Sequence, residues 1–371
     1  LRVGYGKTGN SAVSPYQTKG QLALRHYVFN NGSSEYIGYA PSVMANDQLT
    51  WETTDQWNVG VDFGFLKNRI NGTVEFYLQN TKDLLLKRQL PVVSGFSSVM
   101  SNVGSTRNKG IEITLNTRNI MNRNFTWSTD LTFSANKEEI VELYNGKTDD
   151  VGNLWFIGQP IDVYYNYKKI GIWQNTENDL AEMAKFNEKG ANFKPGSIRL
   201  EDVDGDYKIT EEDKQILGSV RPKFVASMVN NFEFKGFDLS VFLYASVGGL
   251  LRNNIEFMEK PGRGNTVKVD YWTPTNPTNA FPRPSVDVEK LDYISTLGYD
   301  KADFLRIRNI TLGYTLPEMW SKKVLMDKIR IYLSANNPAI FTNFTGIDPE
   351  GANGRTAPSY STWMFGINLS M

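Results

Sequence analysis

Cysteine is absent from all 371 residues, so disulfides, thiolate nucleophiles and cysteine-based metal sites are excluded. The 40 basic and 40 acidic residues balance, so the basic footprint of a nucleic-acid-binding protein is missing. No apolar run reaches about 18 residues, and we therefore expect no transmembrane helix. The single histidine, His26, has no visible catalytic partner, and no P-loop or dinucleotide fingerprint occurs. We expect that this protein is not an enzyme.

Alternation of apolar and polar residues is the dominant pattern that remains. A period of two indicates a β-strand, and the polar faces carry Asp, Glu, Arg and Asn, which suit a water-filled lumen. Many segments reach about 9–11 residues, the length that crosses a bilayer at a tilt. The pattern predicts an all-β fold, an antiparallel transmembrane β-barrel whose apolar face meets lipid. The clearest segments are 57–65, 71–79, 111–116, 125–134, 237–247, 329–336 and 361–371.

The expected connections between strands fall into two classes. Tight turns are predicted at Lys67-Asn68, Lys235-Gly236 and 119–124, whereas the connections 10–49, 136–223 and 248–302 are very long. Short turns at one rim and long external loops at the other are typical of outer-membrane barrels. Aromatic residues make up 13% of the chain, which fits aromatic girdles, although ordinary β-rich packing explains the same excess.

Several short motifs occur in order along the chain, at 1–10, 81–85, 94–96, 102–104, 108–112, 158–160, 171–174, 195–198, 202–206, 304–314 and 331–337. Each motif is weak alone, but their order and spacing together are specific. On these motifs the chain resembles, along its whole length, the SusC/RagA group of TonB-dependent outer-membrane transporters of Bacteroidetes.

The resemblance implies a barrel of about 22 strands around an N-terminal plug, with a TonB box ahead of it. We count about eleven strands by alternation, so residues 1–371 are expected to form the C-terminal portion of the barrel. The chain opens directly on an alternating strand, and we expect the plug and the earlier strands to belong to a longer protein. Alone, the portion would expose two unpaired edges and should not function.

The resemblance also implies partners. A SusD-like surface lipoprotein would cover the barrel mouth, and TonB would act through the missing N-terminal region to admit cargo. Cargo in the family is oligosaccharide or peptide, and the residues do not decide between them. The terminal strand fits the signal that the barrel-assembly machinery reads, with Gly366, Leu369 and Met371 at the implied positions. Methionine departs from the usual terminal aromatic residue.

An acidic stretch at 202–213, inside a long external loop spanning 137–222, is the best-defined candidate for metal binding. Carboxylates at the first, third and fifth positions, a carbonyl at the seventh and a carboxylate at the twelfth can form a calcium cage. Tyr207 departs from the glycine that the sharp turn prefers. A structural calcium and a solvated acidic turn both remain open. The candidate ligands are Asp202, Asp204, Asp206, the Lys208 carbonyl and Asp213.

Aromatic residues in the long loops 137–222 and 250–301 are candidates for contact with cargo, because flat rings stack on sugars and peptide side chains. Packing among loops or contact with a lid protein are the alternatives. The segment 317–327 is expected to form a short helix that caps a turn at the rim. The cargo-contact candidates are Trp155, Phe156, Tyr164, Tyr165, Trp173, Tyr271 and Trp272.

The rival hypothesis is a soluble, secreted, calcium-binding β-rich adhesin or glycan-binding module. It requires the apolar strand faces to be buried against a second layer. The barrel hypothesis instead requires Trp57, Val61, Phe365 and Leu369 to face outward, toward the lipid of the outer membrane.

Overall fold

The chain folds into two compact units, which are described separately. The first comprises Leu1–Met121 with Trp127–Ile161, and the second comprises Asn122–Thr126 with Asp162–Met371. Within the described part of the chain, no helix has the length and apolarity needed to span a membrane. The computed structural model describes residues 1–11, 16, 18–29, 32, 34–96, 98–253, 269–284, 292–351 and 359–371.

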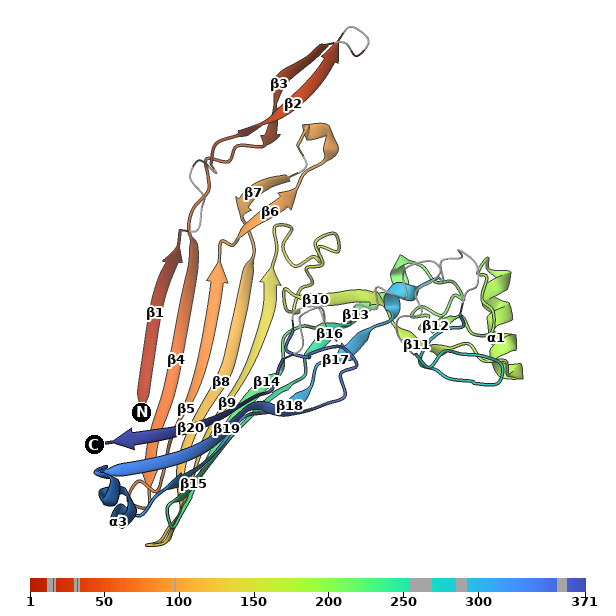
Figure 1. Cartoon of the computed structure of the whole chain (residues 1–371). Helices are drawn as coiled ribbons and strands as arrows, with labels where there is room; N and C mark the ends of the chain where they lie inside the picture. The colour runs from red at the N-terminus through yellow and green to blue at the C-terminus, as the bar shows by residue number, and fades with distance from the viewer. Residues whose placement is uncertain are drawn as a thin grey trace. The chain divides into compact units, whose positions relative to one another are not determined.

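The first unit is built on long neighbouring strands (Figure 1). The pairs β1–β4, β4–β5 and β5–β8 are antiparallel, and the predicted turn at Lys67-Asn68 is confirmed, with positive φ at Leu66, Lys67 and Asn68. Most of these strands exceed the length that crosses a bilayer. In sheet order they are β1 (Arg2–Asn10), β4 (Glu52–Phe65), β5 (Ile70–Lys82), β8 (Ser105–Met121) and β9 (Phe125–Glu142).

The second unit repeats this arrangement. Lys235 and Gly236 both have positive φ in a two-residue turn between its first two strands, which confirms the predicted hairpin. The predicted terminal strand is also confirmed, paired antiparallel with its predecessor. In sheet order the strands are β14 (Phe224–Phe234), β15 (Phe237–Val247), β18 (Phe304–Thr315), β19 (Lys328–Thr342) and β20 (Thr362–Ser370).

The sheets carry apolar residues on their exposed face. Leu239, Leu312, Leu333 and Phe365 are consecutive partners across β15, β18, β19 and β20. Leu333 is 46% exposed and Phe365 is 70% exposed. The four residues predicted to face outward, Trp57, Val61, Phe365 and Leu369, are all exposed. A soluble sandwich would bury this face, so its exposure favours the barrel over the adhesin.

The number of strands and the start of one loop differ from the sequence expectation. The described residues give ten such strands, where alternation indicated about eleven. The loop expected at 137–222 begins later, because β9 continues to Glu142. The charged residues near the end of β9 are typical of a loop. However, the Arg107 guanidinium of β8 lies 3.4 Å from the Glu139 carboxylate of β9, so these two charges are paired across neighbouring strands.

The connection expected at 10–49 contains a hairpin that sequence reasoning missed. Strands β2 (Gln21–Phe29) and β3 (Ser34–Val43) pair antiparallel and carry exposed apolar side chains. A second small hairpin, β6 (Leu85–Gln89) and β7 (Ser98–Asn102), flanks the 3-10 turn η2 (Val92–Ser94). Both hairpins belong to long connections of the first unit.

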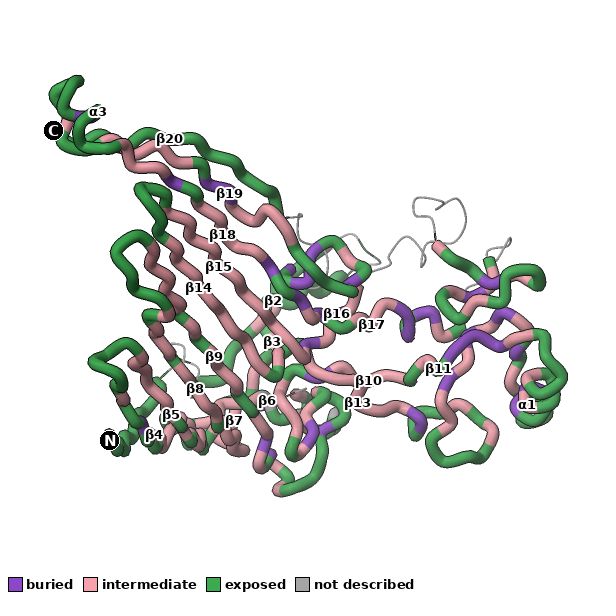
Figure 2. The backbone as a smooth tube through the Cα atoms, turned by 90° about the horizontal axis from the view of Figure 1, so that it is seen from below, coloured by how far each residue is buried: buried purple, intermediate pink, exposed green. Residues whose placement is uncertain are grey.

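The long connection between β9 and β14 contributes to a buried core. Figure 2 shows buried segments beside β11 and α1, while the sheet strands are mostly intermediate or exposed. Buried Ile172, Trp173, Phe186 and Ile198 belong to this core. Its elements are β10 (Val163–Tyr167), β11 (Lys169–Ile172), α1 (Glu177–Glu188), β12 (Ile198–Leu200), η3 (Glu211–Asp213) and β13 (Lys214–Ser219).

The two ends of the connection expected at 250–301 form short strands that pair with each other, β16 (Leu250–Arg252) and β17 (Tyr299–Lys301). The 3-10 turn η4 (Ile294–Thr296) precedes β17. Residues 254–268 and 285–291 of this expected loop lie outside the described residues. The short helix predicted at 317–327 is confirmed as α3 (Glu318–Ser321) followed by η5 (Lys322–Val324).

Candidate functional site

The acidic stretch folds as a tight loop that gathers three carboxylates. The oxygens of Asp202, Asp204 and Asp206 lie within 4.8 Å of one another. Backbone N–H groups hold them in place: Tyr207 N donates to Asp202 Oδ2 at 2.9 Å, and Lys208 N donates to Asp206 Oδ1 at 2.7 Å. Three hard oxygen donors converging in this way suit a cation such as calcium.

The electrostatics of this loop are those of crowded like charges. A hydrogen bond from the Asp206 backbone N–H favours the Asp204 carboxylate, but desolvation and the neighbouring Asp206, Asp202 and Asp213 carboxyl groups outweigh it. The net effect raises the pKa of Asp204 above its ordinary value. A bound cation would act in the opposite direction, because it stabilises the charged form.

Asp213 takes part in the hydrogen bonding that shapes the loop. Its buried carboxylate accepts hydrogen bonds from Val203 N at 2.8 Å and Thr210 N at 2.7 Å, closing a capping box at η3. The group of converging carboxylates therefore contains three of the four expected acids and leaves Asp213 out. Asp213 fixes the shape of the loop, and the capping signature Thr210-x-x-Asp213 could have indicated this from sequence.

Tyr207 occupies the sharp turn where glycine was preferred. Its φ is 63°, in the left-handed region. The ring packs edge-to-face on Phe186 of α1 at 5.4 Å, and the Lys185 ammonium lies 5.0 Å from the ring centroid. Burial of the ring against α1 offsets the backbone strain, so the side chain fastens the acidic loop to the helix.

Most of the cargo-contact candidates pack among the loops, which was the stated alternative. Trp173 is 1% exposed and lies under the Arg199 guanidinium, 4.4 Å from its ring centroid. Buried Trp272 donates its indole N–H to Gln174 Oε1 at 2.8 Å. Phe156 is buried as well, whereas Tyr271 is exposed. Trp155, Tyr164 and Tyr165 are partly buried, with Tyr164 against Tyr299 at 5.2 Å.

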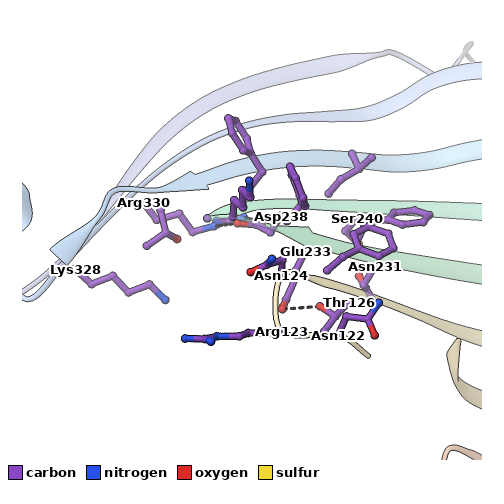
Figure 3. Close-up of a pocket in the computed structure, with 18 residues that line it drawn as sticks. Asn122, Arg123, Asn124, Thr126, Asn231, Glu233, Asp238, Ser240, Lys328 and Arg330 are labelled. Atoms are coloured by element: carbon purple, nitrogen blue, oxygen red, sulfur yellow. Dashed lines mark hydrogen bonds and ion pairs between the residues drawn. The ribbon is translucent and has the colours of Figure 1, made fainter. Parts of the chain in front are cut away.

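A polar cavity of about 600 Å³ lies at the short-turn end of the second unit (Figure 3). It is lined by the turn 122–126, the β14–β15 hairpin and the start of β19. Arg330 pairs with Asp238 at 2.9 Å, and Thr126 donates to Glu233 at 2.9 Å. These residues occupy the polar faces of alternating segments. Sequence reasoning assigned them to a lumen but did not bring them together.

The first unit has a similar polar cavity of about 330 Å³. Glu75 and Glu112 face each other directly across β5 and β8, with Asn58 and Tyr77 beside them in the lining. Both cavities have walls rich in amide, hydroxyl and carboxyl groups. Such walls suit contact with water or with polar segments.

An ion network anchors the connection that follows β19. The buried Arg306 guanidinium contacts Asp348 at 2.8 Å and Glu350 at 2.8 Å, and Arg308 also pairs with Glu350. Burial alone would raise the pKa of Asp348, but hydrogen bonds from the Ser359 hydroxyl, the Glu350 N–H and Arg306 hold it below its ordinary value. Nothing local in the sequence indicated this pairing of residues about forty positions apart.

The three expected assembly-signal residues lie on β20 and directly after it. The Tyr332 ring of β19 occupies the space where a Cβ of Gly366 would stand, so a larger residue there would require that ring to move. Leu369 is paired with Ile329, and Met371 is exposed. Glycine at this position therefore allows the Tyr332 ring to lie across the terminal hairpin.

Comparison with known proteins covers the chain from end to end. A family model described as TonB dependent receptor-like, beta-barrel matches residues 1–363. TonB-dependent receptor P3 of Formosa agariphila is 32% identical, and the alignment covers 99% of this chain and 39% of that protein. TonB-dependent receptor SusC of Bacteroides thetaiotaomicron is 30% identical, with coverage of 100% and 37%.

Solved structures give the same result. The RagAB peptide importer in its open-open state matches with a TM-score of 0.77 and 26% identity, covering all of this chain and 40% of that chain. Its closed-closed state matches with a TM-score of 0.74 and 25% identity. The chain spans about two fifths of the length of these relatives.

Proposed function

We propose that this chain, which belongs to the TonB-dependent receptor-like β-barrel family, forms the C-terminal barrel portion of a SusC-like importer of oligosaccharides or peptides. Its place is the bacterial outer membrane, which the long strands cross. The observation that carries the proposal is the end-to-end likeness to the RagAB importer, together with the exposed apolar strand faces. Its named relatives are receptors and transporters.

In this proposal TonB energises import through the N-terminal region of the whole protein. A test is uptake of fluorescent oligopeptides and oligosaccharides by cells that carry the full-length protein, by deletion cells, and by cells that lack TonB. We expect uptake of one cargo class to be lost in both deletions. Unchanged uptake of both cargo classes in cells that lack the protein would contradict the proposed function. Loss of uptake in those cells but not in cells that lack TonB would contradict the proposed energy source.

A SusD-like lipoprotein is the proposed partner. The chain is similar to SusC and to the RagAB importer, and a resemblance to this group implies a surface lipoprotein over the barrel mouth. The exposed β2–β3 hairpin is a candidate contact, since Leu24 and Tyr39 pair across it and are 56% and 67% exposed. Affinity purification of the full-length protein from outer membranes should retain a lipoprotein in stoichiometric amount. Recovery of the barrel alone under mild detergent would argue against a stable complex.

We also propose a structural calcium in the 202–213 loop, held by Asp202, Asp204 and Asp206. Calcium titration by calorimetry of the full-length protein should give binding that Asp204→Asn abolishes. Glu188→Gln, at an exposed acid at the end of α1, is the matched control and should bind as the parent does. Equal binding by both variants would place the ion elsewhere.

A further inference from the structure

The turn between β18 and β19 carries an unusual cluster of exposed apolar side chains. We call residues 317–327, which include α3 and η5, the rim cap. Met319, Trp320, Val324 and Leu325 are 67%, 53%, 57% and 89% exposed. Of the other short turns, 122–124 and Lys235-Gly236 are polar or glycine-containing, and the turn at Lys67-Asn68 carries one exposed apolar side chain, Leu66, so the rim cap gathers more exposed apolar side chains than any of them.

Polar contacts hold the rim cap in shape. The fully buried Ser321 hydroxyl donates to the backbone oxygens of Glu318 at 3.1 Å and Asp327 at 3.2 Å. Met326 N donates to Ser321 O at 3.1 Å, and Glu318 pairs with Lys322 one turn later. The apolar side chains stay largely exposed in this arrangement, and their exposure needs an explanation.

The rim cap adjoins the lipid-facing surface of the barrel. Asp327 N donates to Ser370 O at 2.8 Å, which ties the cap to the end of the terminal strand (Figure 2). Beside that bond, Ile329 pairs with Leu369, and Leu369 and Met371 are exposed. The apolar rows of β18, β19 and β20 thus end next to the cap, whose own apolar side chains are exposed.

The composition of the cap is that of a membrane interface. Tryptophan prefers the headgroup level, and lysines beside an apolar tip interact with lipid phosphates. Lys322, Lys323 and Lys328 stand within and next to the cap. Short turns of outer-membrane barrels face the periplasm, so the adjacent lipid is the inner leaflet. We propose that the rim cap inserts Trp320, Val324 and Leu325 into the phospholipid interface of the inner leaflet.

This inference rests on the barrel lying in the outer membrane, and the experiment separates the two. The full-length protein, without other cysteines, is spin-labelled at Leu325→Cys and reconstituted in vesicles of phosphatidylethanolamine with some phosphatidylglycerol. Arg123→Cys, in an exposed polar turn, is the aqueous control, and Phe365→Cys, on the exposed strand face, is the lipid control. Accessibility to oxygen and to a water-soluble nickel chelate is measured for each label.

We expect the label at position 325 to resemble that at 365, with more contact with oxygen than with nickel. A label at 325 that behaves like 123 would overturn the proposal, since the cap would then face water. Low access to both reagents would also overturn it, because protein would then cover the cap. A label at 365 that meets water would instead contradict the barrel itself.

A second measurement keeps the proposal falsifiable if the labelled variant does not insert. Brominated lipids quench tryptophan at the depth of the bromine. The parent and Trp320→Phe are compared with bromines near the headgroups and near the chain ends. We expect the parent to have a tryptophan fluorescence component that bromines near the headgroups quench more strongly than bromines near the chain ends. Trp320→Phe should lack this component. An unchanged quenching profile would overturn the proposal.

Discussion

The sheet strands and the core of the long connection between β9 and β14 use apolar residues in opposite ways. On β20 the large apolar side chains are exposed, whereas Trp173 and Ile172 are each 1% exposed. Both patterns occur in one chain, so residue type alone does not say which side is inside. The strand face is open because its solvent is lipid, while the connection meets water and must bury its apolar groups.

Substitution of one tryptophan in each region should give the largest difference in stability between the two regions. Trp173→Ala removes a buried ring that packs on Phe186 and Arg199, and we expect a loss of about 3–5 kcal/mol in the stability of the connection. Trp363→Ala removes a ring that is 65% exposed on β20 and should change stability by about 0.5 kcal/mol or less in detergent. Hydrogen exchange of the full-length protein, resolved by segment, measures both. Equal effects would mean that the two regions do not differ as described.

Charge placed on the two faces of β20 tests the strand side of the comparison. Phe365→Lys puts an ammonium on the lipid face and should cost about 2–4 kcal/mol if the position lies near the bilayer midplane. Met364→Lys, on the opposite face, should cost much less, because that face meets the polar lumen. Folding into liposomes followed by gel mobility gives both values. A larger penalty for Met364→Lys would reverse the assigned faces.

Lowering the pH tests the ion network that anchors the connection after β19. The pKa of Asp348 is lower in the folded protein than in the unfolded chain, so its contribution is complete above the unfolded value of about 4. That contribution is lost as pH falls through the lower folded value. We therefore expect proteolysis of residues 343–351 by an acid-active protease to accelerate below pH of about 4.

The matched variant for this pH effect is Asp348→Asn. It should open the same segment already at neutral pH, since Arg306 then stays buried without one of its carboxylates, and it should remove most of the acid dependence. Acid sensitivity that persists unchanged in Asp348→Asn would assign the effect to another group.

The smallest effect on stability is expected at the β2–β3 hairpin. Leu24→Ser with Tyr39→Ser should leave the stability of the barrel within about 0.5 kcal/mol, because both residues are exposed. The amount of co-purified lipoprotein should nevertheless fall. Arg25→Gln, on the other face of β2, is the control and should retain the partner. Full retention by the double variant would remove the hairpin from the proposed interface.

Sequence reasoning succeeded where structure is governed by local periodicity. The alternation at 57–65 and 361–371 predicted strands, and Lys235-Gly236 predicted a turn, because these signals lie within a few residues. The hairpin β2–β3 was missed because its apolar residues occupy both faces and blur the period of two.

The candidate site was less predictable because its contacts join distant parts of the chain. Asp202, Asp204 and Asp206 were identified from spacing, but the role of Asp213 depends on the backbone around it. Arg306 and Asp348 meet only after β18 and β19 have paired. Whether an aromatic residue such as Trp173 is buried follows from packing, and its sequence neighbours do not determine it.

The core of the β9–β14 connection also includes residues from the next long connection. Trp272, Ile294 and Leu297 lie in one cluster with Ile172 and Ile198. Neither connection could be transplanted alone into a relative without leaving half of this core uncovered. The two connections therefore share one core and depend on each other. We expect their sequences to diversify together among relatives while the sequences of the barrel strands stay constant.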